Sequence, residues 1–91
     1  MIFITTYRVK EFLSKDERRE LLAAFQEQGT LPTTTAHYLT TDGTGGLVID
    51  ETDDLEPGYR NALNYLPWLT FETTPYLTIE QALPHLLDYI A

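Results

Sequence analysis

Two carboxylates, Asp50 and Glu72, are the first candidates for chemistry in this 91-residue sequence. The strands expected around them would place both side chains on one face of a sheet, on either side of a central strand that carries Arg8 near its end. Paired acids can divide acid and base roles or hold a hard cation. The plainer interpretation is a solvated or salt-bridged rim, because the chain has 14 acidic residues and most exposed charges contribute little.

The two histidines, His37 and His85, lie on different predicted elements. Histidine titrates near neutral pH, so His37, beside Tyr38 on a strand, is a candidate general base. No third ligand has the spacing of a metal site and the chain has no cysteine, so we expect neither a metal nor a cofactor. The alternative is that His37 is an ordinary residue of the sheet surface, since the sequence does not fix the direction of its side chain.

Two aromatic residues, Trp68 and Tyr38, could stack on an aromatic ligand, with Val48 and Thr70 on the same predicted face as Trp68. Aromatic side chains equally favour a protein core or the interface of a dimer. The sequence leaves both interpretations open.

Two other patterns resemble ligand sites but have structural explanations. The acidic run 50–56 lacks the spaced D-x-D-x-D-G loop of calcium proteins, and helix capping accounts for Asp53 and Asp54. The glycine-rich segment 42–46 is followed by a strand and by no lysine, so it indicates a turn rather than a phosphate loop.

Hydrophobic periodicity and capping residues predict the elements that position these side chains. The strands are expected at 2–9, 33–41, 47–51 and 68–76, with a hairpin joining the second and third. Ser14 with Glu17 forms a capping box for a first helix that stops at Gly29. Residues 52–54 cap a second helix that ends before Pro67. Thr78 caps a C-terminal helix, in which Pro84 predicts a kink or two short helices.

The order βαββαβ plus a short helix predicts one ferredoxin-like α+β domain over residues 1–91. Its four-stranded antiparallel sheet has the order 4-1-3-2, with both crossover helices on one face. We expect the residues Leu47, Ile49, Leu69 and Phe71 to face the helices. The opposite, open face would carry Val48, Asp50, Trp68, Thr70 and Glu72.

The net charge of −8 disfavours binding to nucleic acid and to anionic membrane surfaces, since their phosphates attract lysine and arginine. The distribution of charge agrees, because no basic residue follows Arg60. This balance also argues against an RNA-recognition sheet, which needs basic and aromatic groups on its open face. No apolar run reaches the length of a membrane span, and the segment 1–9 is expected to be a strand rather than a signal peptide. We expect a cytoplasmic protein.

Four motifs resemble an uncharacterised, domain-of-unknown-function family of small bacterial proteins. They are MIFITTYRV at 1–9, GGLVIDETDD at 45–54, PWLTFETTPYLT at 67–78 and the short helix that follows. The resemblance implies the dimeric α+β-barrel superfamily, in which two copies place their open sheet faces together. It implies no single activity, because that superfamily contains cofactor-independent monooxygenases, haem-degrading enzymes, isomerases and ligand-sensing domains.

Two functional hypotheses follow. The first is a non-enzymatic homodimeric domain that binds a small ligand or a protein partner at the open face. The second is a small cofactor-independent monooxygenase or isomerase acting on an aromatic or hydroxylated substrate in a pocket between sheet and helices. There His37 would be the base, Trp68 and Tyr38 the walls, and Glu72 or Asp50 the orienting group. A pocket of about 300 Å³ or more around these side chains would favour the enzyme.

Overall fold

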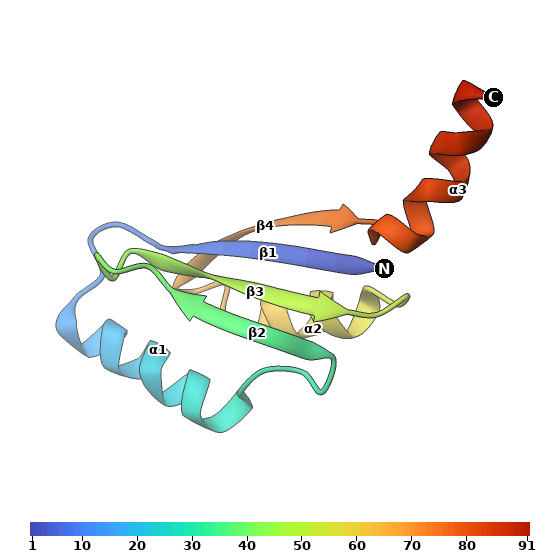
Figure 1. Cartoon of the computed structure of the whole chain (residues 1–91). Coiled ribbons are helices and arrows are strands. Elements are labelled where there is room, and N and C mark those ends of the chain that lie inside the picture. Colours follow the sequence, from blue (N-terminus) through green and yellow to red (C-terminus); the bar gives the residue numbers. More distant parts are fainter.

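The computed structural model describes residues 1–91, which form a four-stranded antiparallel sheet and three helices (Figure 1). In chain order the elements are β1 (Ile2–Val9), α1 (Lys15–Gln28), β2 (Thr34–Leu39), β3 (Gly45–Glu51), α2 (Glu56–Leu63), β4 (Leu69–Tyr76) and α3 (Ile79–Ile90). The predicted ferredoxin-like order of elements is confirmed.

The strands lie in the order β2-β3-β1-β4, and each neighbouring pair is antiparallel. This is the predicted order, with β1 at the centre beside β3. Tyr7 of β1 lies opposite Gly46 of β3 on one side and Phe71 of β4 on the other. The central strand therefore fixes which residues of its two neighbours share a face.

Helix α1 begins and ends where the sequence predicted. The Ser14 hydroxyl accepts a hydrogen bond from the Glu17 amide at 3.1 Å, and the Glu17 carboxylate accepts one from the Ser14 amide at 3.0 Å. Gly29 ends the helix with a φ of 64°, which glycine adopts without steric cost. Leu21 is the residue that α1 buries in the core.

Helix α2 is shorter than predicted and has no side-chain cap on its N-cap residue Leu55. The Asp54 carboxylate accepts a hydrogen bond from the Glu56 amide at 3.0 Å, and Pro57 occupies the first turn as predicted. The helix ends at Leu63, and a turn over 64–68 leads into β4. Trp68 therefore belongs to this turn rather than to the strand.

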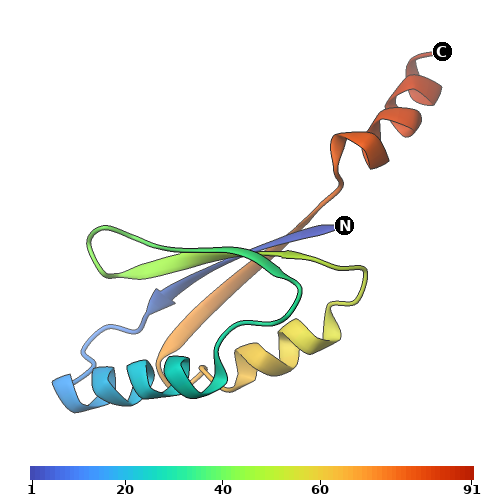
Figure 2. The same cartoon turned by 60° about the horizontal axis from the view of Figure 1, so that its bottom comes forward.

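Helices α1 and α2 both cover the same face of the sheet, as predicted (Figures 1 and 2). The core between them is small. It consists of the buried residues Tyr7, Leu21, Tyr65 and Leu69, with Phe3 buried further along β1. Leu69 is the most enclosed of these, with an exposed fraction of 1%.

The predicted orientation of β3 is wrong. Val48 packs against the core cluster and lies opposite Thr5, so Val48 and Asp50 face the helices. Leu47 and Ile49 consequently face the open side, because neighbouring residues of a strand point to opposite faces and a shift of one position reverses them all. The prediction placed the more apolar residues of β3 on the helix side. The pairing of Gly46 with Tyr7 decides instead which residues of β3 face the helices.

The prediction for β4 is correct, with Leu69 and Phe71 on the helix side and Thr70 and Glu72 on the open side. Trp68 is the exception. It packs half-buried against the core cluster instead of lying on the open face, because the turn that holds it breaks the alternation of the strand.

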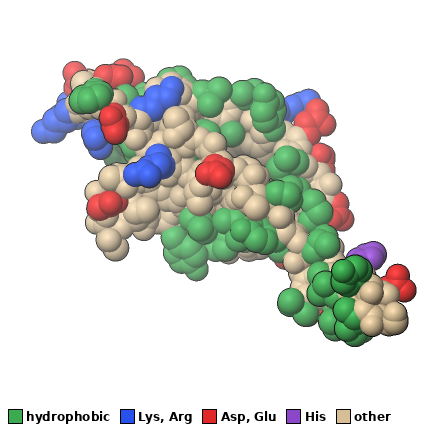
Figure 3. Space-filling model, turned by 90° about the horizontal axis from the view of Figure 1, so that it is seen from above, with side chains coloured by type: hydrophobic (Ala, Val, Ile, Leu, Met, Phe, Trp, Pro, Cys, Tyr) green, Lys and Arg blue, Asp and Glu red, His purple; other side chains and the backbone are tan.

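The open face carries half-buried apolar side chains that no helix of the chain covers. β1 contributes Ile2 and Ile4 to it, and β3 contributes Leu47 and Ile49. Tyr38 of β2 lies opposite Leu47 and is exposed. Figure 3 views the molecule from this side and shows hydrophobic groups toward the edges of the face, with uncharged polar groups and isolated charged groups between them.

Helix α3 projects away from the rest of the molecule (Figures 1 and 2). It begins with a capping box of Thr78 and Gln81 and runs through Pro84 as one helix, rather than as two short ones. The chain has a radius of gyration of 16.0 Å, against about 12 Å for a compact domain of this length. No helix in the chain has the length and apolar character needed to cross a membrane.

Candidate functional site

A cavity of about 430 Å³ lies between the sheet and helices α1 and α2. Its floor is the helix-facing side of all four strands, and its roof comes from α1, α2 and the segments that flank them. Its lining includes the residues Phe3, Thr5, Tyr7, Phe25, His37, Val48, Asp50, Tyr59, Tyr65 and Phe71. Most of the lining is apolar, with a few polar groups at separate points.

The most distinctive polar feature of the cavity is a hydrogen bond of 2.6 Å between Tyr7 Oη and His37 Nε2. The two rings meet edge to face, with centroids 5.7 Å apart. Phe25 of α1 lies 6.1 Å from each ring, centroid to centroid. The pair is thus held on an aromatic wall, and one partner donates while the other accepts.

Gly46 makes this pair possible. Tyr7 is on β1 and His37 is on β2, with β3 between them. The Tyr7 ring crosses β3 directly over Gly46, where a Cβ atom would overlap the phenol ring. Any other residue at position 46 would force the ring aside.

A second polar group of the cavity lies nearer the other end of the strands. The Asp50 carboxylate accepts a hydrogen bond of 2.6 Å from the Thr34 hydroxyl and a longer one of 3.5 Å from Thr33. Between this group and the Tyr7–His37 pair, the hydroxyls of Thr5 and Thr73 lie 2.9 Å apart. The cavity therefore offers hydrogen-bonding partners at both ends and in the middle.

Burial changes the acidity of two tyrosines in this region. It raises the pKa of Tyr7 above the ordinary value of 10.0, because the phenolate would lose its hydration. Burial raises the pKa of Tyr65 in the same way. The Tyr65 hydroxyl donates toward the carbonyls of Ala24 and Gly29, and its ring stacks on Phe25 with centroids 4.8 Å apart. Both phenols are therefore neutral at physiological pH.

The structure divides the residues predicted to form a site. His37, Asp50 and Val48 line the cavity together, although Val48 and Asp50 were expected on the open face. Glu72 lies on the open face, so Asp50 and Glu72 do not form a pair.

The remaining candidates lie outside the cavity. Tyr38 and Thr70 belong to the open face, and Trp68 packs at the edge of the core. His85 is on α3, which is remote from His37 (Figures 1 and 2).

The sequence did not indicate Tyr7 and Phe25, which line the cavity, or Gly46, which lies under the Tyr7 ring. The sequence pattern indicates Tyr7 only as part of a strand, Gly46 as part of a turn and Phe25 as part of a helix stripe. One signal was available, because a glycine within an apolar strand often marks the close approach of another group.

Four of the five acidic residues in the run 50–56 have separate partners. Asp53 lies 3.1 Å from the N-terminal amine, Glu56 pairs with Arg60 at 3.3 Å, and Asp50 and Asp54 accept the hydrogen bonds described above. No three histidine, aspartate or glutamate side chains come close enough to hold a metal ion together.

Fold and cavity together define a ferredoxin-like α+β domain with a half-open, mainly apolar site between its sheet and helices. The chain belongs to the DUF3303 family, a domain of unknown function, and the match extends over residues 1–90. No curated protein matches the chain.

Proposed function

We propose that this protein is a homodimeric domain that binds a small, largely apolar ligand in the cavity between the sheet and helices α1 and α2. The observation that carries the proposal is the Tyr7–His37 hydrogen bond on the aromatic wall of a cavity of about 430 Å³. Ligand sites in proteins span about 300–1,000 Å³ and combine apolar walls with a few convergent polar groups.

The lining indicates the class of ligand. Phe25, Phe71 and Tyr7 offer aromatic surface, which favours a flat ring system. The Tyr7–His37 pair can exchange its mutual hydrogen bond for bonds to a hydroxyl or carbonyl of the ligand. The Asp50 carboxylate would accept from a second hydroxyl. A hydroxylated aromatic compound or a quinone fits this combination.

The homodimer is supported by the open face and by the family resemblance. Ile4, Leu47 and Ile49 form an apolar strip there, which neighbouring side chains leave half-buried and no helix of the chain covers. Two copies that place these faces together would hide the strip from water. Light scattering at tens of micromolar tests this part, and a monomer at that concentration would contradict it.

A thermal-shift screen with hydroxylated aromatics and quinones tests the ligand. The best compound should raise the melting temperature of the wild type, and Tyr7→Phe should weaken its binding about 10-fold through the lost hydrogen bond. Tyr89→Phe, on the remote helix α3, is the matched control and should bind like the wild type. Failure of every compound to stabilise the protein would refute this ligand class.

The second candidate function is a cofactor-independent monooxygenase or isomerase working in the same cavity. The Tyr7–His37 geometry favours it, because a neutral imidazole can take a proton from a bound hydroxyl while the phenol donates to the oxygen that becomes negative. Asp50 would orient the substrate, and Trp68, Tyr38 and Glu72 would have no part.

Incubation with the compounds that bind separates the two functions. An enzyme should convert them, with oxygen uptake for a monooxygenase or an isomeric product without it, and His37→Ala should abolish the conversion. If the wild type binds the compounds without converting them, the enzyme hypothesis is refuted and only the binding function remains.

A further inference from the structure

The apolar stripe of α3 has no partner within the chain. Ile79, Leu83, Leu86 and Ile90 recur at helical spacing, and each is exposed, Ile90 to 73%. A helix of 12 residues is marginal in water by itself, and tertiary packing of an apolar face normally supplies most of its stability. The stripe therefore needs a surface outside the chain to pack against.

The exposed surface area of the chain indicates how large an interface with a partner could be. A compact chain of 10.4 kDa is expected to expose about 5,400 Å² of surface, whereas this one exposes 6888 Å². The excess is about 1,500 Å² per chain. Two such chains would together hide an area typical of obligate homodimers, which bury about 2,000–5,000 Å².

The direction of α3 places it beside a second copy. The helix leaves the end of β4 and rises on the side of the open face, away from α1 and α2 (Figure 1). A second copy lying on the open face would therefore meet α3 along its flank.

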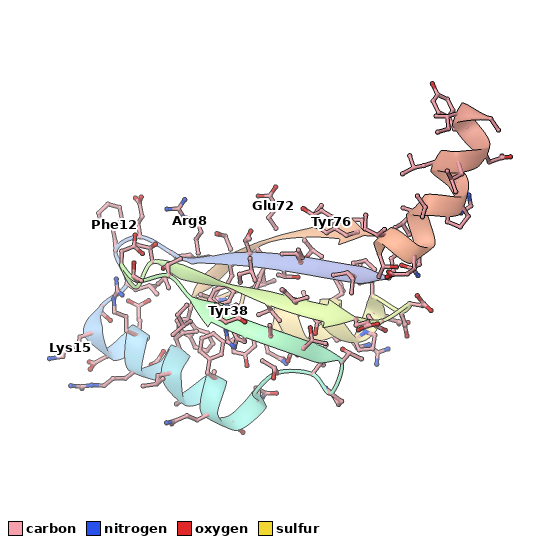
Figure 4. The ribbon with its side chains drawn as sticks, viewed as in Figure 1. Arg8, Phe12, Lys15, Tyr38, Glu72 and Tyr76 are labelled. Atoms are coloured by element: carbon pink, nitrogen blue, oxygen red, sulfur yellow. The ribbon has the colours of Figure 1, made fainter.

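The opposite end of the sheet offers a matching surface. Phe12 follows β1 there, and the residue is 97% exposed with its backbone at a φ of 64°. Figure 4 shows Phe12 and Arg8 on the open-face side at the end remote from α3. A large exposed aromatic group in a strained conformation indicates a contact that the single chain does not provide.

The distribution of charge favours contact of α3 with the Phe12 end of a second copy over contact between two α3 helices. The acidic residues of α3 are Glu80 and Asp88, and the helix has no lysine or arginine. The Phe12 end carries the basic residues Arg8 and Lys10 together with the acidic residues Glu11 and Asp42, the latter in the β2–β3 turn beside the end of β1. A two-fold axis across the strands would bring α3 of each copy to the Phe12 end of the other. An axis along the strands would instead set two acidic helices side by side, which like charge disfavours.

We propose that α3 is an arm that packs its apolar stripe against Phe12 and Arg8 of a second copy, so that each chain of the dimer clasps the other. This inference rests on the homodimer proposed above and adds its symmetry and its contacts. It is independent of the ligand in the cavity.

Engineered disulfides in the full-length chain test the arm, because the natural sequence has no cysteine. The double variant Phe12→Cys/Leu86→Cys should form a covalent dimer on mild oxidation, and neither single variant should do so. Covalent dimers from Leu86→Cys alone would show the two arms side by side and overturn the proposed symmetry. A dimer in solution whose double variant does not crosslink would overturn the arm while leaving the homodimer intact.

Charge substitutions give a second test. Leu86→Glu, in the stripe, should raise the dimer dissociation constant about 100-fold, as expected for a charge placed in the centre of an interface. His85→Glu adds a similar charge on the other side of α3 and should leave the constant unchanged. Equal effects of the two variants would contradict packing by the stripe. A wild-type chain that is monomeric, or that binds phosphatidylcholine vesicles through α3, would overturn the arm.

Discussion

Tyr7 and His37 share a hydrogen bond of 2.6 Å although their strands, β1 and β2, are not neighbours in the sheet. The phenol spans the intervening strand β3 above Gly46, which has no side chain to obstruct it. This arrangement links a local feature of the sequence, a glycine in a strand, to the one polar pair on the aromatic wall of the cavity.

Gly46→Ala should lower the free energy of unfolding by about 1–3 kcal/mol, because the new methyl group overlaps the Tyr7 ring in a packed region. Urea denaturation measures the change, and near-ultraviolet circular dichroism should report the displaced ring. Gly58→Ala is the matched control. It lies in α2 with only an ordinary contact to Leu31, so it should stabilise the protein by about 0.5–1 kcal/mol. Equal losses in both variants would show that Gly46 has no special role.

Stability should fall in alkaline solution because of Tyr7 and Tyr65. Their pKa values are raised in the folded state, so their contribution is complete below pH 10.0 and is lost as the pH rises through the folded values. Urea midpoints measured from about pH 9 to about pH 11.5 should decline, and Tyr7→Phe/Tyr65→Phe should decline less steeply. The same slope in both proteins would contradict the effect of burial.

The turn between β2 and β3 should lose stability in acid. Hydrogen bonds from the Thr44 hydroxyl and amide, and then from the Thr40 hydroxyl, lower the pKa of Asp42 to about 2. The Asp42 carboxylate therefore stabilises the fold above its ordinary pKa of 3.8, and this contribution is lost as the pH falls toward about 2. Thr44→Val should raise the Asp42 pKa, which two-dimensional NMR titration can follow. An unchanged pKa in that variant would rule out the hydroxyl as the cause.

The capping boxes of α1 and α3 should contribute differently to stability. Ser14→Ala should lower the free energy of unfolding by about 1 kcal/mol, since α1 packs on the sheet through Leu21. Thr78→Ala removes the same kind of cap from α3, which packs on nothing within its own chain. In the Leu86→Glu variant, which should be monomeric, Thr78→Ala should reduce the helical circular dichroism signal without changing the urea midpoint. A shift of the midpoint equal to that of Ser14→Ala would show that α3 packs on its own sheet.

Much of the architecture was predictable because it depends on local signals. The Ser14 and Thr78 caps, the Gly29 stop and the alternation of β1 each act within a few residues, so the sequence shows them directly. The order of the elements then restricts the topology, and the strand order of the sheet followed correctly.

Which face each residue of β3 presents was not predictable, because one step of register reverses the whole strand and only its pairing with β1 sets that step. The Tyr7–His37 pair depends on the same pairing, since it joins side chains from separate strands across Gly46. The sequence alone thus determined the elements and their order, through contacts between near neighbours in the chain. The tertiary structure alone decided which side chains share the cavity and that α3 projects uncovered, because contacts between distant segments control both.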